Sequence, residues 1–405
     1  MVKREMEALV HRLAKGYPAL AITGPRQAGK TTLARAVFPD KPYVSLENPD
    51  TRDLATEDPR GFLKKYEGGA ILDEVQNCPQ LFSYLQEVLD SSRETARFVL
   101  TGSQQFSLVQ GITQSLAGRI GMVQLLPFSC QEAYGGQPPG LDETLWRGGY
   151  PPVYDRQLDP SLWYANYIQT YVERDVRKLV NVQDLTSFQR FVRLCAGRVG
   201  QLLNLSQLGS EAGITHNTAK AWLSILEASY VVFQLQPHHR NFNKRLIKTP
   251  KLYFYDTGLA AWLLSIQEAR QIETHPQRGA LFENWVVSEA LKARFNCGLP
   301  SNLYFWRDRS GHEVDLLLEH PNRLTPVEIK SGQTVNADYF SGLEYWLALA
   351  ESPAARAWLV YGGSEGQQRK QTRVISWRNL PALTDLQPGG ENAGPTLSNS
   401  DTNKR

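Results

Sequence analysis

The chain has 405 residues, of which 41% are apolar and 21% charged, and its formal net charge is +3. A chain of this length exceeds the size at which one core keeps growing, so two or three domains are expected. The composition is that of a soluble globular protein. Because the net charge is small, any contact with nucleic acid has to come from local basic patches.

The sequence also disfavours a membrane protein and a disulfide-bonded secreted protein. No apolar run reaches the ~18 residues of a membrane-spanning helix, and the opening "MVKREMEALVHRLAKGYPAL" lacks the continuous apolar centre of a secretory signal. These features predict a cytoplasmic protein with no membrane partner. The four cysteines lie far apart with no C-x-x-C pair, which indicates free thiols.

Residues 1–135 alternate strand-like and helix-like segments. The β-prone runs are "ALAITG", "PYVSLE", "GGAILDE", "RFVLTGS" and "GMVQLLPF". This alternation predicts a parallel sheet with helices on its faces. Two turn-rich stretches, "GGQPPG" at 135–140 and "GGYPPVY" at 148–154, are expected to close this domain.

Residues 24–31, "GPRQAGKT", match G-x-x-x-x-G-K-[ST] between a β-prone run and a helical segment. The glycines let the backbone curl so that N–H groups point at phosphate oxygens, and the helix that begins near Lys30 adds its positive end. We expect Lys30 to contact the β- and γ-phosphates and the Thr31 hydroxyl to ligate Mg²⁺. Arg26 is either a phosphate contact or a solvated loop tip. The predicted nucleotide-binding residues are Gly24, Pro25, Arg26, Gln27, Ala28, Gly29, Lys30, Thr31 and Thr32.

The run "GGAILDEVQ" ends an apolar strand in two acids, where open α/β sheets bind ligands. Asp73 is expected to hold magnesium and Glu74 to orient or deprotonate the attacking water. The bland alternative is a solvated acidic turn. After the next strand, Ser103 is either a γ-phosphate sensor or part of a simple turn. Arg119 either reaches a phosphate, within the chain or from a neighbouring subunit, or is a surface arginine.

The middle of the chain is predicted to be helical. A long amphipathic helix over 161–180 carries Glu173 and Arg177 at i,i+4. Next comes a short helix with Ser206 as its cap, a turn at Gly213, and a second helix capped by Thr215 that runs into a strand. This order predicts a winged helix-turn-helix. The candidate phosphate contacts are Lys220, Arg240, Lys244 and Arg245, but such units equally serve as protein contacts.

From about residue 279 the pattern is helix, three strands, helix, strand. The stretch "GHEVDLLLEHPNRLTPVEIKS" resembles the core of the PD-(D/E)XK nucleases. Side chains alternate along a strand, so Glu328 and Lys330 share a face, and Asp315 lies beside them if the two strands pair. Glu283, on the preceding helix, is the fourth candidate. Such a cluster suits one or two magnesium ions. Alternatively, the fold persists as a binding module without the chemistry.

The motifs "GPRQAGKTTLA", "AILDEVQ", "LTGSQ", "LAGRI", "RGGYP" and "YVERDV", in this order, resemble the bacterial and archaeal AAA-type ATPases with an appended C-terminal domain of unknown function. The resemblance spans nearly the whole chain except the tail. It implies an AAA+ core, a winged helix, a nuclease-like module and ATP as the nucleotide.

The predicted fold is an α/β P-loop NTPase (AAA+-like) parallel-sheet domain at 1–135, followed by a helical connector at 136–200, a winged helix at 201–265, a restriction-endonuclease-like α/β domain at 270–385 and a disordered tail at 386–405. The predicted function is Mg²⁺-dependent ATP hydrolysis coupled to a DNA-binding or nuclease-like C-terminal region. The alternative is a nucleotide-switched signalling or assembly protein whose C-terminal half binds a protein partner or another copy of the chain. A small-molecule kinase is disfavoured, since nothing after the P-loop resembles an acceptor-binding lid.

Overall fold

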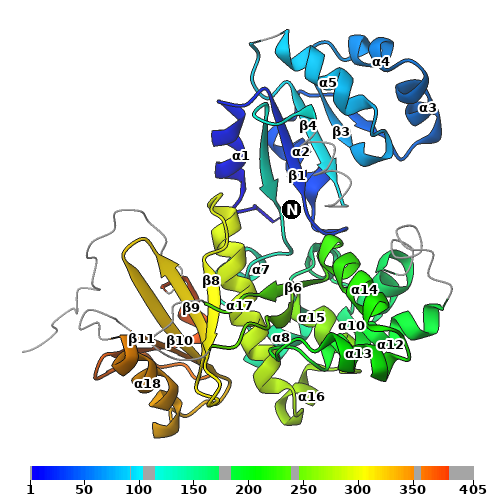
Figure 1. The fold of residues 1–405 in the computed structure, drawn as a ribbon. Helices are drawn as coiled ribbons and strands as arrows, with labels where there is room; N and C mark the ends of the chain where they lie inside the picture. Colours follow the sequence, from blue (N-terminus) through cyan, green and yellow to red (C-terminus); the bar gives the residue numbers. More distant parts are fainter. Residues whose placement is uncertain are drawn as a thin grey trace, which may run out of the picture.

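The computed structural model describes residues 2–91, 93–103, 115–172, 184–238, 246–350 and 357–382. Figure 1 shows a sheet with its helices at one end of the molecule and a larger C-terminal half below it. The first part contains α1 (Glu7–Ala14), β1 (Ala19–Thr23), α2 (Lys30–Val37), β2 (Tyr43–Ser45), α3 (Pro49–Glu57), α4 (Pro59–Lys65), β3 (Ala70–Asp73), α5 (Leu81–Asp90), β4 (Phe98–Gly102) and β5 (Ile120–Gln124). No helix within the described ranges is long and apolar enough to span a membrane.

The first sheet is entirely parallel, as the sequence predicts, with the strand order β2-β3-β4-β1-β5. Its central strands are short apolar runs buried on both faces, which is typical of parallel sheets. Alternate residues of β1 enter two separate cores: Ala21 faces the α4–α5 side and Ile22 faces the α1–α2 side. Since all five strands run the same way, the carboxyl ends of β1, β3 and β4 meet at one edge.

The C-terminal half begins with helices and a two-stranded antiparallel pair. Its elements are α7 (Cys130–Tyr134), α8 (Leu141–Arg147), α9 (Pro151–Asp155), α10 (Pro160–Tyr167), α12 (Leu185–Ala196), α13 (Leu205–Ala212), α14 (His216–Ala228), β6 (Val232–Leu235), β7 (Lys251–Phe254), α15 (Thr257–Leu263) and α16 (Ala269–Thr274). Helix α13 ends at Gly213 in the left-handed region (φ +77°), and the Thr215 side chain caps α14, both as expected. The cap of α13 is Asn204, however, and not Ser206.

A six-stranded mixed sheet completes this half, with the order β12-β13-β11-β10-β9-β8. Its elements are α17 (Arg278–Asn296), β8 (Leu303–Arg307), β9 (Glu313–His320), β10 (Arg323–Lys330), α18 (Ser341–Ala350), β11 (Ala357–Tyr361), β12 (Gln367–Arg369) and β13 (Thr372–Ser376). The predicted order of helix, three strands, helix and strand is therefore present, and strands β12 and β13 extend it beyond the sequence prediction.

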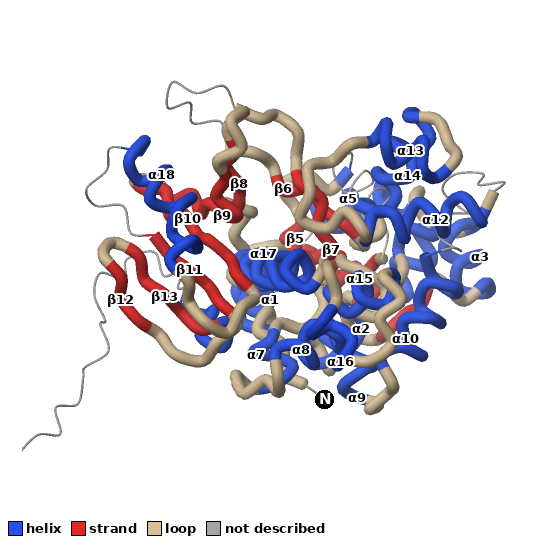
Figure 2. The backbone as a smooth tube through the Cα atoms, turned by 90° about the horizontal axis from the view of Figure 1, so that it is seen from below, coloured by secondary structure: helices blue, strands red, loops and turns tan. Residues whose placement is uncertain are grey.

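Helix α17 is the central element of the C-terminal half. It lies between the six-stranded sheet and the helices around α15 (Figure 2), and it contacts β7, β8 and β10. One continuous apolar core extends from Leu126 to Leu380 through α14, α17 and β10. The domain boundaries between 200 and 270 remain a prediction, because packing in this half is continuous across them.

Several predicted features lie outside the described residues. These are Glu173, Arg177, Arg240, Lys244, Arg245 and the tail at 386–405. The α-helix that begins at Pro160 ends at Tyr167 and continues as a π-helical segment to Val172, where the description stops.

Candidate functional site

The loop between β1 and α2 has the backbone that the phosphate-binding motif requires. Gly24 has φ +145°, and a Cβ atom there would lie 2.0 Å from the carbonyl oxygen of Leu125, so only glycine fits. Gly29 has φ +91° and precedes the first residue of α2. The ammonium of Lys30 donates hydrogen bonds to the carbonyls of Gly24 (3.0 Å) and Pro25 (2.7 Å), so it lies inside the curl of its own loop.

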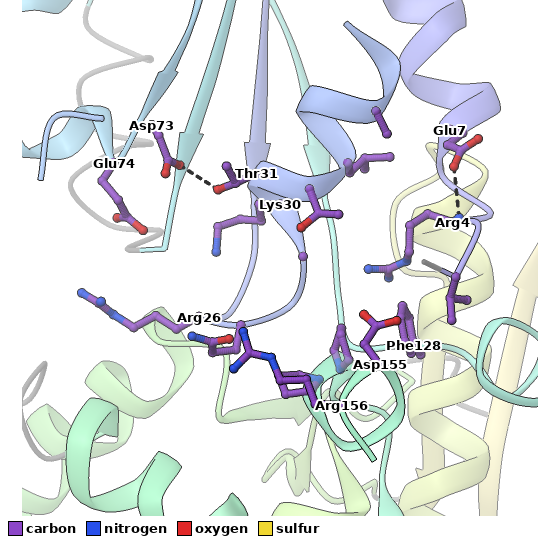
Figure 3. Close-up of a pocket in the computed structure, with 18 of the residues that line it drawn as sticks. Arg4, Glu7, Arg26, Lys30, Thr31, Asp73, Glu74, Phe128, Asp155 and Arg156 are labelled. Atoms are coloured by element: carbon purple, nitrogen blue, oxygen red, sulfur yellow. Dashed lines mark hydrogen bonds between the residues drawn. The ribbon is translucent and has the colours of Figure 1, made fainter. Parts of the chain in front are cut away.

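The structure brings the predicted magnesium ligands together. Thr31 Oγ1 donates to Asp73 Oδ1 over 3.0 Å, as Figure 3 shows. The hydroxyl of Thr101, on the strand between β1 and β3, donates to the same carboxylate oxygen, and Tyr43 donates to Oδ2 over 2.7 Å. Burial, and then the hydrogen bond to Asp73, raise the pKa of Tyr43 to about 12, so this hydroxyl stays a donor. The hydroxyls fix the carboxylate at the edge of the sheet.

Glu74 has a backbone conformation that is rare for its residue type. Its φ of +53° and ψ of +45° are left-handed, where a non-glycine residue is strained. This turn sends its side chain toward the end of β4, where Ser103 Oγ donates to Glu74 Oε2 over 3.1 Å and the Gln76 amide donates to the same oxygen. Ser103 therefore contacts Glu74, a neighbour that the sequence did not identify.

A cavity of about 410 Å³ opens over these groups. Figure 3 shows Lys30 and Glu74 on one side of it, and Phe128, Asp155 and Arg156 on another. Three distant segments line it: the amino-terminal residues, the loop and β3 acids of the first sheet, and the chain from Phe128 to Arg156. The lining residues used below are Val2, Arg4, Lys30, Thr31, Leu33, Ala36, Glu47, Asp73, Glu74, Phe128, Pro151, Pro152 and Arg156. The stretch "GGYPPVY" is thus a wall of the cavity as well as a turn.

Arg4 holds the amino-terminal segment against this cavity. Its guanidinium donates to the carbonyl of Ala28 in the phosphate-binding loop (2.7 Å), to the carbonyl of Leu126 (2.8 Å) and to the carboxylate of Glu132 (2.9 Å). Both members of the Arg4–Glu132 ion pair are buried. Arg4 was not predictable from the sequence, because its partners are far away along the chain and no local motif marks it.

Arg119 is not brought to the phosphate-binding loop. It immediately precedes β5, whose first residue pairs with Ala19, so it lies at the edge of the sheet opposite the loop. Its guanidinium binds the Asp90 carboxylate over 2.5 and 2.9 Å. The expectation that Arg119 reaches a phosphate within its own chain is therefore wrong, because the length of β1 separates it from that edge.

The C-terminal half is hydrogen-bonded to the end of β1 that leads into the loop. Tyr230, which follows α14, is buried and donates to Oγ1 of Thr23, the last residue of β1 (3.0 Å). Asp256 caps α15 and accepts bonds from the Gly149 amide and the Tyr164 hydroxyl, both over 2.6 Å. Asp256 is thus a positioning residue for the turn that leads into Pro151, and no sequence motif marks it.

Helix α17 supplies another connection. Lys292 donates to the carbonyl of Phe128 (2.9 Å), and Glu289 accepts a bond from the Cys130 amide (2.8 Å). Lys292 and Glu289 pair with each other over 2.7 Å and are both buried. Removing one member of a buried ion pair is strongly destabilising. The pair therefore fixes the position of Phe128, which lines the cavity.

The C-terminal candidates cluster as predicted where β9 and β10 pair. Asp315 accepts a bond from the Ile329 amide (2.9 Å), and the Lys330 ammonium contacts Asp315 (3.4 Å) and Glu328 (2.5 Å). Burial works against the charge of Lys330, but the two carboxylates raise its pKa above its usual range. Glu328 Oε2 is buried and has no hydrogen-bond partner among the described atoms.

Glu283 joins this cluster through Lys251, a residue that was not among the sequence-predicted candidates. Lys251 on β7 pairs with Glu283 over 2.9 Å and with Glu313 at closer range. The Tyr253 hydroxyl donates to the same oxygen of Glu283 (2.5 Å). Burial, opposed by Lys251, raises the pKa of Glu283. Lys251, Tyr253 and Tyr255 alternate along "KLYFYD", and this period-two run of polar groups was the available signal.

Glu328→Gln is expected to flatten the pH dependence of stability. Burial, and then the charge of Asp315, raise the pKa of Glu328 from 4.5 to about 8. The folded chain therefore holds this proton more tightly than the unfolded chain. The stability that this proton contributes is lost as pH rises from 4.5 through about 8. Relative to wild type, the variant should gain roughly 3 °C or more in Tm at pH 8.5, with little gain at pH 5.

Thermal melts followed by circular dichroism at pH 5, 6.5 and 8.5 measure this difference. Glu344→Gln is the matched control, since Glu344 forms an exposed ion pair with Lys370. Parallel pH profiles for Glu328→Gln and wild type would contradict the assignment.

The two predicted magnesium sites differ in their fit. Thr31 and Asp73 offer a hydroxyl and a carboxylate oxygen at the sheet edge, the oxygen set with which Mg²⁺ binds nucleotide phosphates. In the C-terminal cluster, ammonium groups already bind the carboxylates. Among the residues that the structure describes, no group of three or more His, Cys, Asp or Glu side chains is arranged to hold a metal.

Comparison with known families divides the chain into three stretches. Residues 16–134 match the family described as AAA domain. Residues 139–270 match a domain of unknown function (DUF8612), and residues 278–380 match another (DUF4143).

Two relatives and several solved structures are also similar to this chain. Uncharacterized protein Rv2008c of Mycobacterium tuberculosis and Uncharacterized protein Mb2031c of Mycobacterium bovis are each 34% identical over 369 residues, which is 89% of this chain and 80% of theirs. The Walker-type ATPase PABY2304 of Pyrococcus abyssi is 15% identical, with 65% of this chain and 96% of that chain covered and a TM-score of 0.44. The chain belongs to the same family as the two mycobacterial proteins and carries an AAA-type P-loop ATPase domain.

Proposed function

We propose that this chain hydrolyses ATP at its P-loop and transmits the nucleotide state to a C-terminal half that binds DNA. One observation carries the proposal: the cavity over Lys30 and Glu74 is closed on another side by Pro151, Pro152, Asp155 and Arg156. A nucleotide in this cavity contacts the AAA domain and the C-terminal half together. The AAA domain match supports ATP binding and hydrolysis.

The phosphates are proposed to lie on the loop from Gly24 to Thr32, with Lys30 as their cation. Thr31 and Asp73 would hold Mg²⁺, which neutralises phosphate charge when bound. Glu74 would accept a proton from the attacking water, and Ser103 would keep its carboxylate oriented. The side chain of Arg156 extends toward the loop and is a further candidate phosphate contact (Figure 3).

The apolar part of the cavity suits a purine base. The residues proposed to contact it are Val2, Leu33, Ala36, Phe128, Pro151 and Pro152. Since Pro151 follows the turn held by Asp256, and Thr23 before the loop is held by Tyr230, a change at the phosphates reaches α14 and α15 through hydrogen bonds. Helices α12–α14 with β6 and β7 are proposed to form a winged helix, on which Lys220 of α14 is exposed.

The test is an ATPase assay with purified protein, with and without duplex DNA at low salt. Turnover is expected to rise several-fold with DNA, and Lys220→Ala is expected to reduce the response without changing basal turnover. Lys64→Ala, an exposed lysine on α4, is the control. Turnover that ignores DNA, together with no retention of DNA, would contradict the proposed DNA binding.

A second candidate is a nucleotide-switched assembly protein whose C-terminal half binds a protein. The cluster of Glu283, Asp315 and Glu328 favours this second function. Its carboxylates already bind lysine side chains, whereas a nuclease would need them to bind metal. Indifference of ATP turnover to DNA would support this reading, and DNA-stimulated turnover would count against it.

A further inference from the structure

The acid cluster in the C-terminal half contains a buried lysine from a different sheet. Lys251 is the first residue of β7, and its side chain is 3% exposed. Its backbone is held in β7 opposite Leu235 and bridged to Leu202. The ammonium therefore enters the cluster from the β6–β7 pair, while the carboxylates stand on α17, β9 and β10.

The lysines account for all the carboxylates. Lys251 binds Glu283 and Glu313, and Lys330 binds Asp315 and Glu328. Arg307 adds a further contact to Glu313 over 2.9 Å. Four carboxylates thus face three fixed cations, and this leaves little negative charge for an additional divalent ion.

We infer that the ammonium of Lys251 takes the cation position of this cluster, so the folded chain binds no divalent metal there and cannot cut DNA by a metal-dependent route. The cluster instead joins the β6–β7 pair to α17 and the six-stranded sheet. A tethered cation has a high effective concentration, so a free ion competes with it poorly.

The surroundings keep Lys251 in this position. The Lys251 ammonium lies 5.5 Å from the ring centre of Phe305, at cation–π distance. Tyr253, two residues along β7 and therefore on the same face, donates to Glu283 as well. Two side chains of one strand thus converge on the carboxylate that the nuclease resemblance assigns to metal binding.

The experiment titrates nucleotide-free protein with Mn²⁺ and measures free ion by electron paramagnetic resonance. Wild type is expected to show no site at the cluster tighter than ~1 mM. Lys251→Ala opens the position and should add one site at least ~10-fold tighter, because Glu283 and Glu313 lose their cation. Adding Glu283→Gln to this variant should abolish the gain. The P-loop is the same in all three proteins, so its contribution cancels.

Lys248→Ala is the matched control: Lys248 is an exposed lysine just before β7, and its loss should add no site. If Lys251→Ala melts without a cooperative transition, millimolar Mn²⁺ should restore the transition, and failure to do so would overturn the inference. A wild-type Mn²⁺ site removed by Glu283→Gln, or Mn²⁺-dependent DNA cleavage by wild type that Asp315→Asn abolishes, would also overturn it.

Discussion

Lys30→Ala is expected to weaken ATP binding by 100-fold or more. The Lys30 side chain is 6% exposed and lies within the curl of the loop, 2.7 and 3.0 Å from two of its carbonyls. A lysine there serves as the mobile cation for the phosphates, and losing charge-assisted hydrogen bonds of this kind costs about 3 kcal/mol, which is roughly two decades in Kd. Calorimetric titration with ATP and Mg²⁺ measures the change.

Two further proteins separate lost binding from lost folding. Lys30→Met keeps the aliphatic stem that packs in the loop and should lose ATP as severely as Lys30→Ala while melting like wild type. Lys64→Ala removes an exposed lysine outside the cavity and should bind ATP normally. An ATP isotherm unchanged in Lys30→Ala would remove the phosphate site from this loop, and with it the proposed function.

The parts of the site that the sequence predicted are those carried by short local motifs. The loop was predictable from Gly24, Gly29 and Lys30, because its backbone geometry requires those residue types in that order. Asp73 was predictable because an acid at the end of an apolar strand reaches the ligand edge of a parallel sheet. Its contact with Thr31 then depends on β4 lying between β1 and β3, which the sequence did not predict.

The remaining walls come from long-range contacts that no local pattern encodes. Arg4 meets Leu126, and Gly149 meets Asp256, across more than a hundred residues each. The two alternatives for Arg119 could not be separated from the sequence for the same reason: a motif names a residue type but does not say at which end of the sheet it lies. Lys251 lies in a basic stretch that the sequence predicts to be an exposed wing. Only the packing of β7 against α17 shows that its charge is buried.

Strand β7 also explains why the C-terminal half is hard to divide from sequence. The sequence pattern of helices and strands changes near residue 270. Across this change, the backbone N–H of Phe254 donates to the side-chain amide of Asn284 on α17, and the Phe254 carbonyl accepts a bond from it; Asn284 is fully buried. Apolar residues on both sides of the change enter one core. Composition and turn signals mark where the chain bends, whereas this core is set by which faces meet.

Glu74→Gln is expected to leave ATP affinity within about 2-fold of wild type and to lower turnover by 10²-fold or more, the usual cost of losing a general base. The substitution keeps the shape of the side chain and removes its charge, so Ser103 and Gln76 retain an acceptor. Glu47→Gln is the control, because Glu47 lines the same cavity but its carboxylate pairs with Arg26. Phosphate release measured at saturating ATP separates the two variants.

Normal turnover in Glu74→Gln would exclude Glu74 as the base, whereas equal losses in both variants would point to the electrostatics of the cavity as a whole. The left-handed backbone at Glu74 favours a loss of turnover in Glu74→Gln alone, since such strain is kept where a side chain must be aimed.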